Sequence, residues 1–118
     1  MQSFRFGPEG GRAIDAHGSV GVTLAPLTEP LARGAMVQAA CFRLEPGGRI
    51  GRHRATVPQL LAVVAGSGWA SGADGAREPI GPGDAVFWEA GEEHETGTDE
   101  GLTAIVIEGE TMRPFQAG

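Results

Sequence analysis

The sequence predicts an all-β domain, a sandwich or barrel of short strands joined by tight turns. Its 118 residues include 20 glycines and 8 prolines, which leave little room for long helices. Hydrophobic residues make up 41% of the chain and the formal net charge is only −6, so we expect a packed core rather than disorder. The length suits one domain, covering residues 1–118.

Several segments combine strand length with apolar or β-branched residues, and they are 20–24, 59–65, 85–88 and 102–107. The segment 59–65 is apolar throughout its last six positions and ends at a glycine, as expected for a strand buried on both faces. Residues 35–45 contain neither Gly nor Pro. Their Ala, Met, Gln and Leu content leaves both helix and strand open for this segment.

Turn residues separate these segments. Pro-Gly pairs at 46–48 and 82–84 place Pro where φ is fixed and Gly where positive φ is allowed. The sequence Gly-Ala-Asp-Gly at 72–75 predicts a hairpin with an Asp-Gly tip, which joins strands at 69–71 and 77–80.

The composition excludes several classes of function. Lys and Arg number 9 against 15 Asp and Glu, which argues against nucleic-acid binding because that depends on cationic patches. The longest apolar run, 60–65, is far shorter than the ~20 residues of a membrane helix. Cys41 is the single cysteine, so no intrachain disulfide forms, and the first residues resemble no secretory signal. We therefore expect a cytoplasmic protein without membrane partners.

The chain has three histidines, His17, His53 and His94. His53 and His94 each follow a Pro-Gly turn, so two similar turn–strand units deliver one imidazole each. On an extended strand, inward positions recur every second residue, so His53 shares its face with Ala55 and Gln59 provided that the three residues between 55 and 59 stay extended. His17 lies in a predicted turn and is expected to have no chemical role.

Residues 47–66 resemble the first motif of the cupin superfamily, in which two histidines and a glutamate lie between spaced glycines. The positions that match this motif are Gly47, His53 and Gly66. Ala55 stands where the motif has its second His, and Gln59 stands where it has Glu.

Residues 83–98 resemble the second cupin motif, which ends in a further histidine. The positions that match are Gly83, Gly91 and His94. Glu89 replaces the motif's Pro, and Thr98 replaces its Asn. Together the two motifs identify the chain as resembling a small single-domain cupin with an incomplete ligand set.

The resemblance implies a conical β-barrel of the jelly-roll type, the double-stranded β-helix, built from two antiparallel sheets. It also implies a homodimer formed by pairing N-terminal strands, and a small-molecule site inside the barrel with Gln59, Trp88 and Phe42 as contacts. One divalent metal ion (Fe, Mn, Ni, Co, Cu or Zn) would be held by His53, His94 and Gln59. The amide of Gln59 is a weaker ligand than a carboxylate, so such a site has no protein charge to offset the ion.

Two functional classes remain open at this stage. One is a metal-dependent oxygenase, isomerase or lyase acting on a small molecule. The other is a non-enzymatic ligand-binding or accessory cupin without a stable metal. Covalent hydrolysis is disfavoured because the chain shows no nucleophile–base–orienter set.

Gln59, Cys41 and the charged residues near the histidines also have purely structural interpretations. Gln59 is then a buried amide bonded to backbone or to His53, and Cys41 is a small buried hydrophobe. Glu92 belongs to a solvated loop, and Arg52 is a surface charge. The segments 1–19 and 110–118 are peripheral arms.

Overall fold

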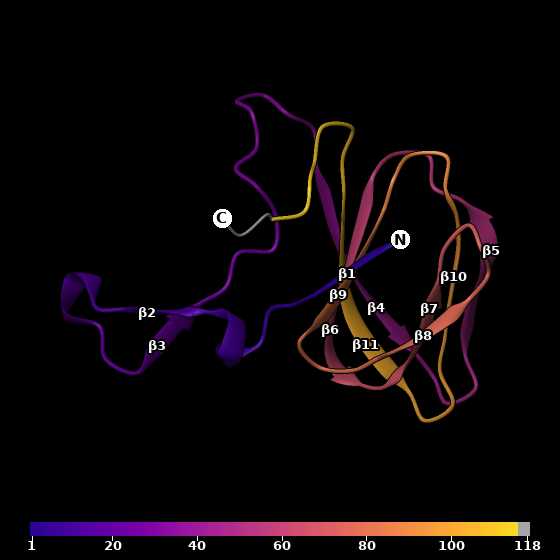
Figure 1. Cartoon of the computed structure of the whole chain (residues 1–118), viewed down its shortest axis with the longest axis horizontal. Coiled ribbons are helices and arrows are strands. Elements are labelled where there is room, and N and C mark those ends of the chain that lie inside the picture. The colour runs from indigo at the N-terminus through magenta and orange to yellow at the C-terminus, as the bar shows by residue number, and fades with distance from the viewer. Residues whose placement is uncertain (116–118) are drawn as a thin grey trace.

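Two antiparallel sheets form the body of the protein in this computed structural model, which describes residues 1–115 (Figure 1). The strands of the five-stranded sheet, in spatial order, are β1 (Gln2–Arg5), β9 (Asp84–Trp88), β6 (Gln59–Gly66), β11 (Leu102–Glu108) and β4 (Gln38–Leu44). Those of the four-stranded sheet are β5 (Arg49–Arg54), β10 (Glu93–Gly97), β7 (Gly68–Ser71) and β8 (Arg77–Ile80). The all-β prediction and the two-sheet jelly-roll arrangement are confirmed.

The apolar segments of the sequence form the centre of the larger sheet. The predicted strands at 59–65, 85–88 and 102–107 correspond to β6, β9 and β11, and the predicted hairpin corresponds to β7 and β8. The ambiguous segment 35–45 contains the strand β4, which pairs with the edge of β11 along its whole length. Pairing with β11 therefore decides between the helix and the strand that residue propensities had left open for this segment.

The core lies between the two sheets. Inward residues of β6, β9 and β11, such as Leu61, Trp88 and Ala104, pack against Ala70 and Ile80 of the smaller sheet. This packing follows from the period of two along each strand, which sends alternate side chains to the same face. The inward positions of the larger sheet therefore determine which side chains line the barrel.

A second apolar cluster covers the outer face of the larger sheet. Leu60 and Phe87 lie there with Met112, which is fully buried. The segment 110–118 is described only as far as Phe115, and at Met112 it is not the peripheral arm that the sequence predicted. Residues 116–118 of that prediction lie outside the described residues.

The glycines that match the two cupin motifs share one backbone property. Each of them has positive φ, and they are Gly47, Gly66, Gly83 and Gly91. At Gly66 a Cβ would also overlap the carbonyl oxygen of Gly101. The motif spacing is thus a set of turns that only glycine makes without strain.

β4 and β5 are edge strands of the two sheets, and they do not pair with each other. Phe42 faces inward with Ala104, its partner on β11, yet 42% of its surface is exposed. Cys41 points the other way and is also exposed, so the prediction that it is a buried hydrophobe was wrong. The reason is that β4 is an edge strand, and the outer apolar cluster is formed by residues of other strands and segments.

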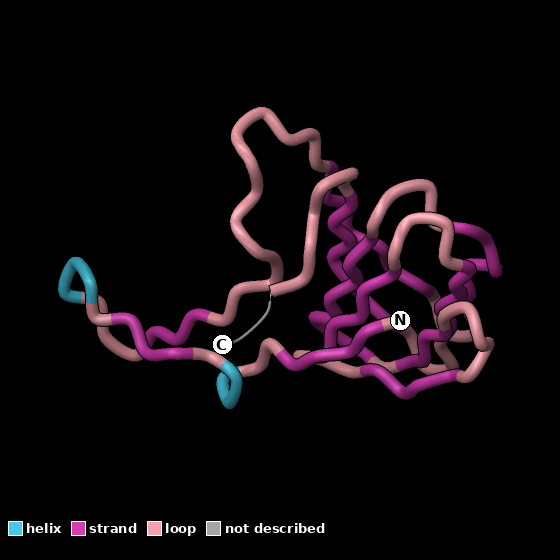
Figure 2. Tube along the Cα trace, turned by 45° about the horizontal axis from the view of Figure 1, so that its top comes forward, coloured by secondary structure: helices cyan, strands magenta, loops and turns pink. Residues whose placement is uncertain are grey.

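A hairpin of β2 (Arg12–Ile14) and β3 (Val22–Leu24) projects from the body, as Figures 1 and 2 both show. Short 3-10 turns lie at Pro8–Gly10 and Ala16–Gly18, and the second contains His17 at the hairpin tip, as its predicted turn position requires. The predicted arm 1–19 is only partly peripheral, since β1 belongs to the main sheet. Within residues 1–115, no helix has the length and apolar character needed to span a membrane.

Candidate functional site

The site is built around a pair of histidines on neighbouring strands. The ladder between β5 and β10 places His53 directly opposite His94, and the centroids of the two rings lie 4.3 Å apart. The ladder then changes register between His94 and Thr96, an irregularity of the kind that re-aims side chains. His94 is buried, whereas His53 is exposed on the edge strand β5.

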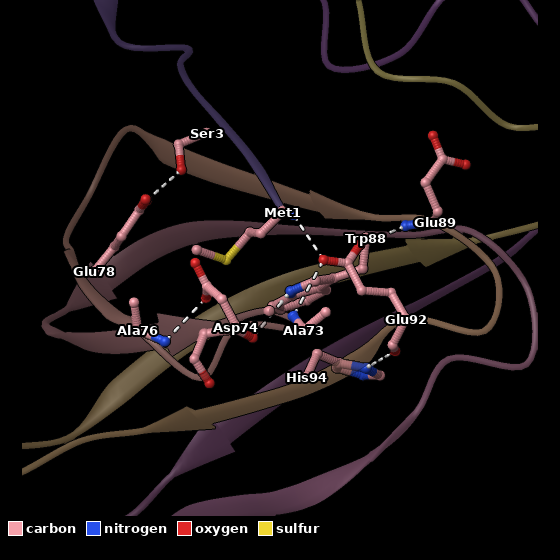
Figure 3. Close-up of polar contacts among 12 residues, drawn as sticks. Met1, Ser3, Ala73, Asp74, Ala76, Glu78, Trp88, Glu89, Glu92 and His94 are labelled. Carbon is pink, nitrogen blue, oxygen red and sulfur yellow. Dashed lines mark hydrogen bonds and ion pairs between the residues drawn. The ribbon is translucent and has the colours of Figure 1, made fainter.

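Backbone carbonyls hold both imidazoles in the same tautomer. Nδ1 of His53 donates to the carbonyl oxygen of Gly51 at 2.7 Å. Nδ1 of His94 donates to the carbonyl oxygen of Glu92 at 3.2 Å, a contact drawn in Figure 3. Because a carbonyl oxygen can only accept, each Nδ1 carries the proton. In the neutral ring, Nε2 then keeps its lone pair for a ligand, which is how metal-binding histidines are oriented.

The electrostatic environment keeps His94 neutral. Burial lowers the pKa of His94 below its ordinary value of 6.5, because the cation is poorly solvated there. The bond to the Glu92 carbonyl acts in the opposite direction, and the neighbouring His53 adds to the lowering. A neutral imidazole at pH 7 is the form that binds a metal ion or accepts a proton.

This lowered pKa predicts an acid sensitivity of the fold. The unfolded chain takes up a proton at His94 more readily than the native state does, so native stability is lost as pH falls below about 6.5. We expect the free energy of unfolding of the wild type to decrease over this range, measured by denaturant titration at several pH values. His94→Gln, which cannot titrate, is expected to flatten that part of the curve, and an unchanged slope in this variant would contradict the prediction.

The opposite wall of the site comes from the larger sheet. Trp88 is buried, its ring centroid lies 4.6 Å from that of His94, and its Nε1 donates to the carbonyl oxygen of Ser71. Gln59 is the register partner of Trp88 on β6. The larger sheet therefore carries one large ring in contact with His94 and, on the next strand, an amide beside that ring.

The Gln59 side chain has a partner that sequence reasoning missed. Its Nε2 donates to Oε2 of Glu108 at 2.9 Å, rather than to backbone or to His53. Glu108 is the last residue of β11 and lies opposite Gln59 in that ladder. The two residues are far apart in the chain, and only the strand register brings them together.

Two other residues considered from the sequence, Glu92 and Arg52, have structural contacts. The Glu92 carboxylate faces the Met1 amino group at 2.6 Å and accepts from the Glu89 N–H (Figure 3). Burial acts to raise the pKa of Glu92, but these bonds lower it overall. Glu92 is thus a paired, half-buried anion and not the solvated loop residue expected from the sequence. Arg52 donates to the carbonyl oxygens of Gly72 and Ala73, which ties β5 to the β7–β8 hairpin.

Ala55 lies just after β5, at the position where the motif has its second histidine. Only 2% of its surface is exposed, and its backbone pairs with that of Glu92 and Gly91 in the facing loop. Its methyl group offers no ligand atom.

The site has few side-chain atoms that could coordinate a metal ion. Within residues 1–115, no group of three or more His, Cys, Asp and Glu side chains is arranged to hold one. The histidine pair with the amide oxygen of Gln59 supplies two nitrogens and one neutral oxygen. These atoms fit an open, weakly binding site that leaves positions for substrate or water.

A comparison of the sequence with known protein families agrees with this arrangement of two histidines on facing turn–strand units. Residues 40–110 match the model of the family described as Cupin domain, and this span covers both motifs and the histidine pair. The chain belongs to the cupin family. This membership accounts for the arrangement of two antiparallel sheets.

A curated protein and solved structures extend the comparison. The cupin is 45% identical over 60 residues to (R)-mandelonitrile lyase of Granulicella tundricola, a match covering 51% of this chain and 46% of that protein. The match therefore spans about half the length of this relative.

Among solved structures, an RmlC-like cupin of Shewanella frigidimarina has a TM-score of 0.60 at 19% identity, over 64% of this chain and 67% of that one. A predicted oxalate decarboxylase of Thermotoga maritima has a TM-score of 0.55 at 22% identity, over 65% of each chain. At these identities the likeness concerns the fold alone.

Proposed function

We propose that this cupin binds a small organic molecule in its open barrel and acts on it as a lyase, with one divalent metal ion held by His53, His94 and Gln59. The observation that carries the proposal is the pair of adjacent imidazoles, each with Nδ1 bonded to backbone and Nε2 left for a ligand. The name of the curated relative, (R)-mandelonitrile lyase, supports the reaction class and makes a small hydroxy nitrile the substrate class to test.

The residues of the site have distinct roles in this proposal. A bound divalent ion supplies Lewis acidity toward a substrate oxygen. The two imidazoles, through Nε2, and the amide, through Oε1 of Gln59, would hold that ion. The exposed Phe42 would contact the carbon skeleton, and the buried Trp88 would support His94. When a hydroxy nitrile is cleaved, the bond between carbon and the nitrile group breaks and its electron pair departs with cyanide as the carbonyl forms. The hydroxyl proton passes through water to the cyanide, so the products are an aldehyde and hydrogen cyanide.

The test begins with protein purified without chelator or nickel resin. Its metal content is measured by elemental analysis, divalent ions are titrated by calorimetry, and aldehyde release from (R)-mandelonitrile is followed by absorbance. We expect the wild type to bind an ion and release aldehyde, and His94→Ala to lose both. The matched control is His17→Asn, because His17 is an exposed turn residue with φ 61°, a conformation that Asn tolerates.

The outcomes test the metal site and the lyase activity separately. A wild type that takes up no divalent ion contradicts the metal site. Ion binding without aldehyde release contradicts the hydroxy nitrile lyase and leaves a metal-binding cupin of another activity.

A second candidate function, non-enzymatic ligand binding without a stable metal, is favoured by one observation. Ala55 provides a buried methyl where the motif has a histidine, so one nitrogen ligand is missing. In this case the imidazoles would contact the ligand directly as hydrogen-bond partners. Ligand binding that persists in the presence of a chelator would distinguish this function from the metal-dependent one.

We also propose that the protein is a homodimer in which the β2–β3 hairpin packs on a second copy. Val22 and Leu24 share one face of β3 and are exposed, and Val20, in the loop just before this strand, is 91% exposed. Such an apolar strip on a projecting element favours a partner over solvent.

The expected assembled mass is twice 12.2 kDa by light scattering. Val22→Asp is expected to shift the mass toward the monomer, because it buries a charge in the interface. Thr23→Asp places the same charge on the other face of β3 and is expected to leave the mass unchanged. A monomeric wild type contradicts the dimer.

A further inference from the structure

Glu108 is the last residue of β11 in the larger sheet, where it lies between two neighbouring strands of that sheet. It follows Val106 on the inward face of β11, and its register partners are Gln59 on β6 and Gln38 on β4. The residue is half-buried and is paired with strands on both sides, so it does not lie on a free loop. The only hydrogen bond that this carboxylate accepts within residues 1–115 comes from the Gln59 amide.

This hydrogen bond decides which way the Gln59 amide is turned. A carboxylate only accepts, so the NH2 end of the amide must face Glu108, and the bond is 2.9 Å long. The carbonyl end, Oε1, is then directed away from Glu108. Without the carboxylate, either end of the amide could take either position, and the NH2 end cannot coordinate a cation.

Glu108 also carries a charge that no cationic side chain neutralises within residues 1–115. The ion pairs of this part of the chain involve other carboxylates, those of Glu9, Asp84, Glu89, Glu92, Glu93 and Glu95. Glu108 lines a hollow of about 580 Å³ with Met36 and Val57, where water can solvate it. The two histidines and Gln59 include no carboxylate, and Glu108 is the acidic residue hydrogen-bonded to Gln59.

We propose that Glu108 is the positioning residue of the metal site. Its carboxylate turns Oε1 of Gln59 toward the imidazoles. It also polarises the amide, so that Oε1 gives its electron pair to a metal ion more readily, and it offsets part of the charge of a divalent ion. A partner of this kind, bonded to a ligand rather than to the metal, is what orients and tunes ligands in protein metal sites. The inference rests on the proposed function, since it needs the ion to bind at His53, His94 and Gln59.

The test uses Co²⁺ titrated into the full chain, with calorimetry for affinity and visible absorption for the ligand field. Glu108→Gln keeps the size of the side chain and removes the charge, and we expect it to weaken Co²⁺ binding about 10- to 100-fold and to shift the absorption bands. The matched control is Glu110→Gln, which removes a charge from the same hollow two residues further on. We expect this control to keep both the wild-type affinity and the wild-type bands.

A double-mutant cycle shows whether Glu108 acts through Gln59. In a Gln59→Ala background, the change Glu108→Gln is expected to cost little further affinity, because the residue through which it acts is gone. An undiminished loss in that background overturns the positioning role. Thermal unfolding of each ion-free variant monitors the fold, and Glu108→Asp replaces Glu108→Gln if the latter does not fold. Glu108→Asp keeps the charge but shortens the reach, so it too is expected to lose affinity and shift the bands.

The failure of this inference differs from the failure of the function on which it rests. A wild type that does not bind Co²⁺ overturns both. A wild type that binds, with variants at Glu108 that match it in affinity and spectrum, overturns the role of Glu108 alone.

Discussion

The double variant Ala55→His/Gln59→Glu is expected to bind a divalent ion at least ~100-fold more tightly than the wild type, a gain of ~3 kcal/mol or more. The variant adds a nitrogen where the first cupin motif has its second histidine, and a carboxylate where it has Glu. Both groups are stronger contributors to a divalent site than a methyl group and a neutral amide. Calorimetric titration with several ions measures the gain.

The structure adds an expectation for the ion-free state of this variant. The carboxylate introduced by Gln59→Glu would face Glu108, where the wild type has an amide donating to the Glu108 carboxylate. Two carboxylates at this distance repel, so the ion-free variant should unfold more easily than the wild type, and the ion should more than restore its stability. Thermal unfolding with and without ion measures both effects.

Adding His94→Ala to the double variant provides the control, and it should abolish most of the gain. Binding seen only in the double variant, with none in the wild type, supports the metal-free function. If neither protein binds, the imidazoles and the position of Gln59 do not converge on one ion.

Trp88→Ala is expected to give the largest loss of stability of any single change considered for this chain, about 3–5 kcal/mol. Only 1% of the surface of Trp88 is exposed, and the residue belongs to the core between the sheets. The change leaves a large cavity, removes the bond from Nε1 to the Ser71 carbonyl oxygen and takes away the ring against which His94 rests. Denaturant unfolding measures the loss, provided that the slope with denaturant is unchanged.

Trp69→Ala is the matched control. Trp69 is only half-buried at the surface of the smaller sheet, with the Arg77 guanidinium 3.7 Å above its ring. Its removal exposes less core and is expected to cost clearly less than the Trp88 change. Equal losses for the two tryptophans would mean that the core between the sheets does not depend on Trp88.

Several features of the fold followed from local patterns in the sequence. Apolar runs of strand length predicted β6, β9 and β11, and the Asp-Gly tip predicted the β7–β8 hairpin. These predictions hold because alternation of burial and the allowed backbone conformations of turns are properties of neighbouring residues. The resemblance of the glycine and histidine spacing to cupin motifs predicted the two-sheet architecture.

The predictions that failed concern surroundings rather than local conformation. Cys41 lies on a strand, which was one of the open alternatives, but its exposure depends on whether another segment covers β4. The same holds for Met112, which is buried because residues close to the end of the chain return to the outer face of the larger sheet. Burial of this kind is set by packing between segments that are far apart in the chain.

The sequence by itself determined that two turn–strand units would each carry one imidazole, and that a methyl and an amide would stand at the places of two further ligands. The tertiary structure alone decided that His53 and His94 lie opposite each other, that burial holds His94 neutral, and that Glu108 orients the amide of Gln59. The physical reason is that register between strands acts across many residues of intervening chain. Whether a donor meets an acceptor, and whether a charge is solvated, depends on that register and not on the nearest residues in the sequence.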